Sequence, residues 1–162
     1  LAELDLGSNP IGKFGVYDLC TAIQSEIRWV SLNISYLEGL SGTANAEMSA
    51  NLVTPIKSCL SNSGLRDLDC SGNGLGDSGA SEVVEAIRDR DTFERLAMNN
   101  SGCGILVATV LKDVLAVRPG RALRVLELRG NALNDDCMRV FAKGLALSTS
   151  LEILILAENL IT

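Results

Sequence analysis

The side chains that could carry chemistry in this sequence are mainly carboxylates and cysteines, and histidine is absent. Without histidine the commonest general base and metal ligand is missing, which excludes Ser-His and Cys-His hydrolase chemistry. The cysteines show no C-x-x-C spacing, so we expect buried thiols in a reducing compartment. They are Cys20, Cys59, Cys70, Cys103 and Cys137. No G-x-x-x-x-G-K-[ST] phosphate loop occurs either, so the sequence predicts no active site of its own, no metal site and no cofactor.

Acidic residues outnumber basic ones, 20 to 14, and the formal net charge is −6. This balance argues against nucleic acid or an anionic membrane as the main partner, and it favours a protein with a basic patch. Asp67, Asp69 and Asp77 lie close in sequence, but we expect them on different faces and solvated rather than bound to a cation. No apolar run of about 18 residues and no signal-peptide pattern occurs. We expect a cytoplasmic protein, or one associated with the cytoskeleton, a cilium or the nuclear envelope.

The segment that best defines the elements around these residues is Leu123–Leu133, which reads L-x-x-L-x-L-x-x-N-x-L. This is the strand-and-turn pattern of a leucine-rich repeat. Leu126 and Leu128 would share the buried face of a short strand, and the amide of Asn131 would bond the backbone of neighbouring coils. The same frame recurs along the chain. It begins at Leu1, Ile27, Leu65, Phe93, Leu123 and Leu151.

Apolar residues at helical spacing follow the strand segments. They are Val16, Leu19, Cys20 and Ile23, then Ala80, Val83, Val84 and Ile87, then Met138, Phe141, Ala142 and Leu145. The alternation predicts an α/β leucine-rich-repeat solenoid, a horseshoe with parallel strands on the concave face and helices on the convex face. Residues 1–162 would form a single leucine-rich-repeat domain, with about five full repeats and a final strand, as a fragment of a longer protein.

The second repeat is overlong because of the stretch Leu37–Ser63. Glycines and small polar residues there predict an ordered loop, followed by a helix over 48–60. Pro55 should kink this helix, or restart it with Thr54 as a cap. Long loops in compact domains are more often functional than decorative, so this loop is a candidate contact site.

Strand residues that alternate away from the core would line the concave face. Trp29, the only tryptophan, is expected there beside carboxylates, as an exposed hot spot for a basic partner. The alternative is that Trp29 only packs against the inserted loop. The predicted partner-binding residues are Trp29, Asn33, Glu38, Leu40, Asp67, Asp69, Arg95, Asn99, Glu127 and Arg129.

The turns of three consecutive repeats resemble those of the Ran GTPase-activating proteins. They are LDCSGNGLG at 68–76, MNNSGCG at 98–104 and RGNALND at 129–135. The segment AENLI at 157–161 resembles the repeat that follows in that family, and the overlong second repeat matches its spacing. The resemblance covers nearly the whole chain. The repeat type is shared with ribonuclease inhibitor, innate-immune receptor tails and several cytoskeletal proteins.

The resemblance implies a GTPase activator or GTPase-binding protein with a small GTPase as its partner. In that family an Asn of an N-N-x-G turn helps to orient the glutamine and water of the GTPase, and its position here is Asn100. A neutral amide suits this task because positioning is most of what GTP hydrolysis lacks. The alternative is that Asn100 is a turn residue tolerating an unusual backbone conformation.

The same family carries an Arg in its long loop, at the position of Leu40. An aliphatic side chain cannot neutralise phosphate, whereas a binding surface would survive this change. The alternative function is therefore a non-catalytic scaffold or assembly subunit of a cytoskeletal, ciliary or nuclear complex.

Overall fold

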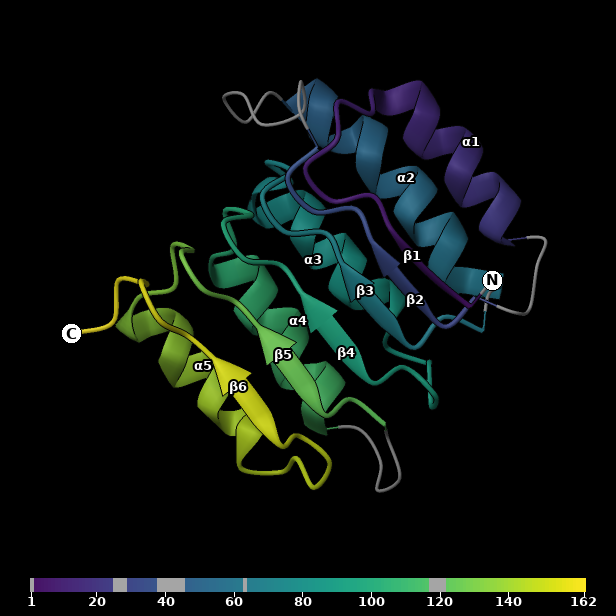
Figure 1. Ribbon diagram of the computed structural model, residues 1–162. Coiled ribbons are helices and arrows are strands. Elements are labelled where there is room, and N and C mark those ends of the chain that lie inside the picture. The colour runs from purple at the N-terminus through teal and green to yellow at the C-terminus, as the bar shows by residue number, and fades with distance from the viewer. Residues whose placement is uncertain (1, 25–28, 38–45, 63, 117–121) are drawn as a thin grey trace.

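The computed structural model describes residues 2–24, 29–37, 46–62, 64–116 and 122–162, in which short strands alternate with helices (Figure 1). The strands are β1 (Glu3–Asp5), β2 (Ser31–Asn33), β3 (Asp67–Asp69), β4 (Arg95–Ala97), β5 (Val125–Glu127) and β6 (Ile153–Ile155). The helices are α1 (Lys13–Gln24), α2 (Ala46–Asn62), α3 (Gly76–Ala86), α4 (Ile105–Ala116) and α5 (Asp135–Leu145).

The strands form one parallel sheet in the order β1-β2-β3-β4-β5-β6. Each helix packs against the next along the chain, and the helices all cover the same face of the sheet (Figure 1). The predicted α/β leucine-rich-repeat solenoid is therefore confirmed. Its concave face is the face of the sheet opposite the helices.

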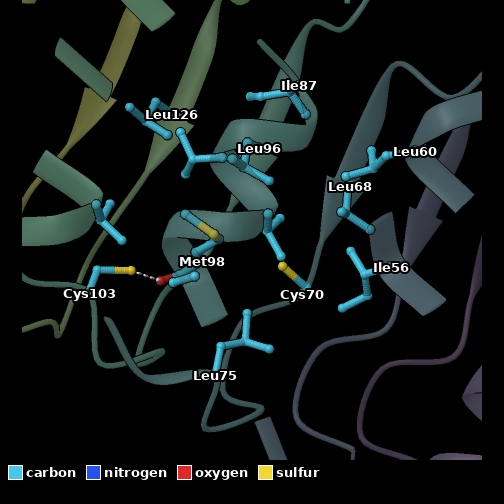
Figure 2. Packing of buried hydrophobic residues seen from close by; sticks show 14 of the residues in the cluster. Ile56, Leu60, Leu68, Cys70, Leu75, Ile87, Leu96, Met98, Cys103 and Leu126 are labelled. Atoms are coloured by element: carbon cyan, nitrogen blue, oxygen red, sulfur yellow. Dashed lines mark hydrogen bonds between the residues drawn. The ribbon is translucent and has the colours of Figure 1, made fainter. Parts of the chain in front are cut away.

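A row of leucines crosses the sheet at the central position of every strand. Strand pairing aligns Leu4, Leu32, Leu68, Leu96, Leu126 and Leu154. These leucines point toward the helices, and the core runs from repeat to repeat as one cluster (Figure 2). A solenoid has this kind of core because each repeat can bury its apolar face only against its neighbours.

The register of the second repeat differs from the prediction by two residues. Each strand begins two residues after the first residue of its repeat, so the repeat containing β2 begins at Trp29 and not at Ile27. Ile34 is fully buried beside Leu32, whereas Val30 is 39% exposed. The sequence leaves the register of this strand ambiguous. Val30 and Leu32 are apolar residues two positions apart, as are Leu32 and Ile34, so either pair could form the buried face of the strand.

We number the repeats 1 to 6 from the corrected starting residues. They are Leu1, Trp29, Leu65, Phe93, Leu123 and Leu151. Trp29 thus occupies the first leucine position of repeat 2, where it is half-buried and packs against the core. The expectation that Trp29 is an exposed concave residue is wrong, since an aromatic ring at this position covers the core edge.

The asparagine ladder predicted for Asn131 is confirmed. Its Oδ1 accepts hydrogen bonds from the backbone amides of Ser101 at 3.0 Å and Cys103 at 2.9 Å. Its Nδ2 donates to the carbonyls of Met98 and Leu128, both at 2.9 Å. One buried side chain thus satisfies backbone groups of repeats 4 and 5, which would otherwise be costly to bury.

Two details of the helices depart from the expected pattern. Helix α2 runs continuously through Pro55, so it does not restart at Thr54, and packing of the apolar face outweighs the missing amide bond. In α5 the buried residues are Cys137, Phe141 and Gly144, whereas Ala142 is exposed. A Cβ on Gly144 would lie 2.6 Å from the backbone of Lys112 in α4, so this glycine allows the close helix contact that sets the buried face.

Candidate functional site

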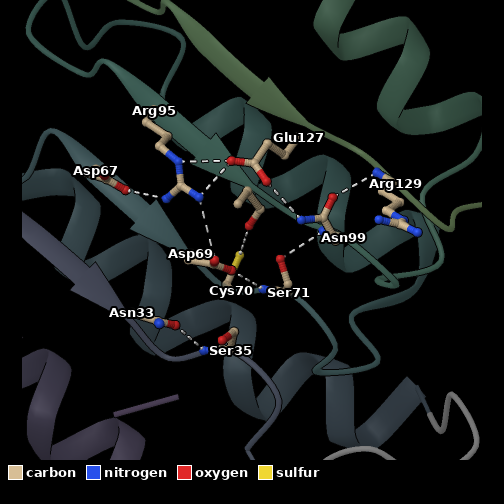
Figure 3. A network of polar contacts seen from close by, with 11 residues as sticks. Asn33, Ser35, Asp67, Asp69, Cys70, Ser71, Arg95, Asn99, Glu127 and Arg129 are labelled. Atoms are coloured by element: carbon tan, nitrogen blue, oxygen red, sulfur yellow. Dashed lines mark hydrogen bonds and ion pairs between the residues drawn. The ribbon is translucent and has the colours of Figure 1, made fainter. Parts of the chain in front are cut away.

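The structure brings most of the predicted partner-binding residues to the concave face. Those on or directly after the strands are Asn33, Asp67, Asp69, Arg95, Asn99, Glu127 and Arg129. Figure 3 shows them along neighbouring strands, with several linked by polar contacts. Trp29 does not join them, and Glu38 and Leu40 lie outside the described residues.

A hollow of about 470 Å³ lies over the first strands of this face. Glu3 and Asp5 of β1 line one side, and Asp67 and Asp69 of β3 line the other. Strand β2 between them contributes shorter side chains, and the pairing places Ser31 between Glu3 and Asp67 in one row across the sheet. Carboxylates on two sides of a hollow with a short, neutral floor suit a cationic side chain of a partner.

Arg95 of β4 closes this hollow on the side of β5 and makes ion pairs with carboxylates of two other strands, β3 and β5 (Figure 3). Its guanidinium donates to Asp67 Oδ1 at 2.9 Å and to Glu127 Oε1 at 2.7 Å, and it lies 3.7 Å from Asp69. Burial opposes the charge of Arg95, but the hydrogen bonds to Asp67 and Glu127 outweigh it and raise the pKa of the guanidinium. The arginine is therefore a fixed positive charge within an acidic surface.

Asn99 extends the network beyond the end of β4. Its Nδ2 donates to Glu127 Oε2 at 3.2 Å, and its Oδ1 accepts the backbone amide of Arg129 at 2.8 Å. The backbone amide of Asn99 donates to the hydroxyl of Ser71 at 2.9 Å. These bonds hold the concave residues of repeats 3, 4 and 5 in defined positions, which lowers the ordering cost of binding.

A second surface, which we call the rim, lies where the chain turns after each strand. Its residues occupy the same position in every repeat and share a left-handed backbone, with φ from 50° to 70°. They are Ser8, Tyr36, Gly72, Asn100, Gly130 and Glu158. The turn-residue interpretation of Asn100 is therefore supported directly, since Asn tolerates this conformation better than most residues.

The rim side chains lie over the glycines of neighbouring repeats. A Cβ on Gly72 would be 2.2 Å from the ring of Tyr36, and a Cβ on Gly130 would be 2.1 Å from Asn100 Oδ1. Tyr36 reaches across Gly72, and its hydroxyl accepts a hydrogen bond from Asn100 Nδ2 at 2.6 Å. Asn100 is thus exposed and held by an aromatic neighbour two repeats away.

Arg129 and Glu158 form an ion pair at the end of the rim nearest the C-terminus. The hydrogen bond between them raises the pKa of Arg129 and lowers the pKa of Glu158. Both side chains remain exposed, so the pair contributes little to stability and mainly adds one positive and one negative charge to the surface.

Asp77 lies away from Asp67 and Asp69, as predicted, but it is not merely solvated. Its carboxylate accepts the backbone amides of Gly104 at 2.7 Å, Leu106 at 2.9 Å and Val107 at 3.0 Å. It therefore caps the first turn of α4 from the preceding repeat, where amide groups lack partners within the helix.

Two absences apply to the described parts of the chain. Within them no group of three or more His, Cys, Asp or Glu side chains could hold a metal ion. Their helices are also too short or too polar to span a membrane.

Sequence reasoning missed the role of Tyr36. The misplaced start of repeat 2 put this tyrosine out of line with Asn100, so the two were not recognised as equivalent turn positions. Aligning the repeats on Ile34 instead of Val30 would have placed Tyr36 on the rim. Its bond to Asn100 spans 64 residues and leaves no local signal.

Comparison with known proteins supports the repeat assignment. A family profile described as Leucine Rich repeat matches residues 61–84. "NACHT, LRR and PYD domains-containing protein 3" of Rattus norvegicus is 32% identical over 146 residues, covering 90% of this chain and 13% of that protein. Ribonuclease inhibitor of Sus scrofa is 28% identical over 164 residues, covering 100% of this chain and 34% of the inhibitor.

Among solved structures, an internalin from Listeria monocytogenes matches with a TM-score of 0.33 and 16% identity, covering 100% of this chain and 63% of that one. The chain spans only 13% of the length of the first relative above. The parallel sheet, the helices on one face of it and the matching repeat profile together identify this chain as a leucine-rich-repeat protein, and its repeats are similar to those of ribonuclease inhibitor.

Proposed function

We propose that this chain binds another protein through its concave face, with a basic segment of the partner in the hollow between β1 and β3. The observation that carries the proposal is the charge of that hollow. Glu3, Asp5, Asp67 and Asp69 face it, and among the described residues that line it Arg95 is the one cation. Since Arg95 is already paired with Asp67 and Glu127, the carboxylates of β1 are the groups left for a partner.

The network around Arg95 and Asn99 supports recognition by a rigid surface. Its side chains are tied to each other and to the backbone, so a partner would meet them already positioned. Preorganised polar groups increase affinity because less side-chain entropy is lost on binding. This proposal involves no reacting group and no cofactor. We further propose that the protein is cytoplasmic, where its free, buried cysteines would stay reduced.

A narrower proposal is that the partner is a small GTPase of the Ran type. It rests on the turn sequences and on Asn100, which is exposed on the rim and fixed by Tyr36. Single-turnover GTP hydrolysis by purified Ran, with the full-length protein and with Asn100→Ala, tests this. Strong stimulation that the variant loses would establish an activator. No stimulation would favour a scaffold that binds without catalysis.

The broader proposal is tested with a fluorescein-labelled nonapeptide of arginine and with an acidic peptide of the same length. We expect the arginine peptide to bind, and the double variant Glu3→Gln/Asp5→Asn to weaken it about tenfold, that is by about 1.4 kcal/mol. The matched control is Glu82→Gln/Glu152→Gln, which removes the same charge from two exposed ion pairs away from the hollow.

Fluorescence anisotropy at two salt concentrations gives the dissociation constants. Equal weakening in the test and control variants would show nonspecific attraction to an acidic protein, and it would overturn the assignment to the hollow. Absence of binding at low salt, where exposed charges interact most strongly, would overturn the preference for a basic partner.

A further inference from the structure

Two cysteines face each other where the first two helices pack together. Cys20 lies on α1 and Cys59 on α2, and α1 and α2 lie side by side (Figure 1). Both thiols are buried in the core, and their side chains hydrogen-bond to each other. Neither is needed for the proposed recognition of a partner, so this pair is a separate feature of the fold.

The surroundings of the pair favour a thiolate on Cys59. The hydrogen bond from Cys20 lowers the pKa of Cys59, burial opposes this shift, and the positive charge of Arg90 adds to it. The same hydrogen bond and burial raise the pKa of Cys20, which makes it the thiol that keeps its proton. A cysteine of lowered pKa that is hydrogen-bonded to a second thiol can form a reversible disulfide with it.

Two other core cysteines, Cys70 and Cys103, bond to backbone carbonyls and have raised pKa values. Cys70 Sγ donates to the carbonyl of Ala97 at 3.6 Å. Cys103 Sγ donates to the carbonyl of Met98 at 4.0 Å (Figure 2). Burial raises the pKa of Cys70, and it raises that of Cys103 to about 12. These thiols act as small apolar residues and serve as internal controls.

We propose that Cys20 and Cys59 are a redox-sensitive pair that a hydroperoxide converts to a disulfide clamp between α1 and α2. The Cys59 thiolate attacks one peroxide oxygen, the O–O bond breaks, and the leaving oxygen takes up a proton as water or alcohol. The Cys20 sulfur then attacks the sulfenic acid on Cys59 and expels its oxygen as water. The two thiols lose two electrons in all, and the peroxide gains them.

The clamp would fix repeat 1 to repeat 2. Cys20 belongs to the same repeat as β1, so a covalent link to α2 would also hold the side of the hollow formed by Glu3 and Asp5. A small oxidant would reach the pair when α1 opens briefly from α2, since both thiols are buried at rest.

Peptide mapping tests the proposal because trypsin places each cysteine on its own peptide. Cys20 falls in residues 14–28, Cys59 in 58–66, Cys70 in 67–88 and Cys103 in 96–112. The full-length protein is treated under native conditions with graded hydrogen peroxide. Free thiols are then blocked with N-ethylmaleimide in denaturant, and the protein is digested without reductant for mass spectrometry.

We expect a linked peptide of 14–28 and 58–66 at peroxide doses that leave 67–88 and 96–112 fully alkylated. In Cys20→Ala, dimedone should trap a sulfenic acid on Cys59, whereas in Cys59→Ala none should form on Cys20. Absence of the linked peptide, its appearance only with oxidation of Cys70 and Cys103, or the reverse dimedone pattern would overturn the proposal.

A melting curve gives a readout that needs no variant. The oxidised protein should melt several degrees above the reduced one, and dithiothreitol should abolish the difference, since a crosslink restricts the unfolded chain. A lower melting temperature after formation of the link would show that the disulfide strains the helices and is not a clamp.

Discussion

Arg95 on β4 makes two hydrogen bonds to one carboxylate oxygen of Glu127 on β5, from Nε at 3.0 Å and from Nη2 at 2.7 Å. The same guanidinium donates to Asp67 on β3. One side chain thus joins three adjacent strands, and its charge cancels part of the acidic surface proposed for the partner. Stability and affinity are therefore opposed at this residue.

Arg95→Gln should tighten binding of the arginine peptide roughly fivefold, about 1 kcal/mol, because a positive charge leaves the binding face. The same change should lower the free energy of unfolding by about 1–3 kcal/mol, since the carboxylates lose a charged donor. Anisotropy titration and urea unfolding of one protein sample measure both. Arg124→Gln, in an exposed pair with Glu152, should change stability by less than about 1 kcal/mol. Weaker peptide binding by Arg95→Gln would show that the ordering of the carboxylates by Arg95 contributes more to affinity than its positive charge removes.

Three glycines separate backbone strain from steric contact. Gly72 and Gly76 have φ values of +70° and +67°, but a Cβ would strike Tyr36 only at Gly72, and Gly12 has no neighbour within 4 Å and no left-handed backbone. Gly76→Ala should cost about 1–2 kcal/mol, Gly72→Ala about 1 kcal/mol more, and Gly12→Ala less than about 0.5 kcal/mol.

Chemical denaturation ranks these three variants. In a Tyr36→Ala background the excess cost of Gly72→Ala over Gly76→Ala should vanish, because the ring that a Cβ would strike is gone. If the excess persists there, the packing of Tyr36 over Gly72 does not occur in solution.

Asn131→Ala tests the asparagine ladder. It leaves the buried amides of Ser101 and Cys103 without their acceptor, so we expect a loss of about 2–4 kcal/mol in the free energy of unfolding. Asn9 occupies the same repeat position but is exposed, and within the described residues its side chain bonds only to the nearby carbonyls of Leu6 and Gly7. Asn9→Ala should therefore cost less than about 1 kcal/mol. Similar losses of unfolding free energy in both variants would show that burial of Asn131 gives its hydrogen bonds no added weight.

A pair of aspartate substitutions tests the register of repeat 2. Ile34 is fully buried, so Ile34→Asp should unfold the protein or cost several kcal/mol, since it buries an unpaired carboxylate. Val30 is 39% exposed, and Val30→Asp should change stability by less than about 1 kcal/mol. Circular dichroism melting curves distinguish the two. The opposite order would restore the start of this repeat at Ile27.

Much of the fold was predictable because it depends on short periodic patterns. The spacing of Leu126, Leu128 and Asn131 predicts a strand, its buried face and a ladder residue, and the structure confirms all three. The register failed in repeat 2, where Trp29 replaces the usual leucine and the neighbouring residues alternate equally well in two frames. Helix α2 passes through Pro55 because tertiary packing outweighs a local propensity.

The candidate site was predictable only in part. The alternation of strand residues placed Asp67, Asp69, Arg95 and Glu127 on one face, and the structure brings them into contact. The choice of partners within that face could not be predicted, because it depends on side-chain reach across strands. The contact between Tyr36 and Asn100 was also hidden, since it joins repeats that are not neighbours.

That contact bears on how the molecule would respond to force. The strand and helix contacts run from each repeat to the next, so a chain pulled from its two ends would peel apart one repeat at a time. The bond from Tyr36 to Asn100 spans from repeat 2 to repeat 4 and passes over repeat 3. Under tension, repeats 2 to 4 would therefore yield together as one mechanical block, while repeats 1, 5 and 6 detach singly.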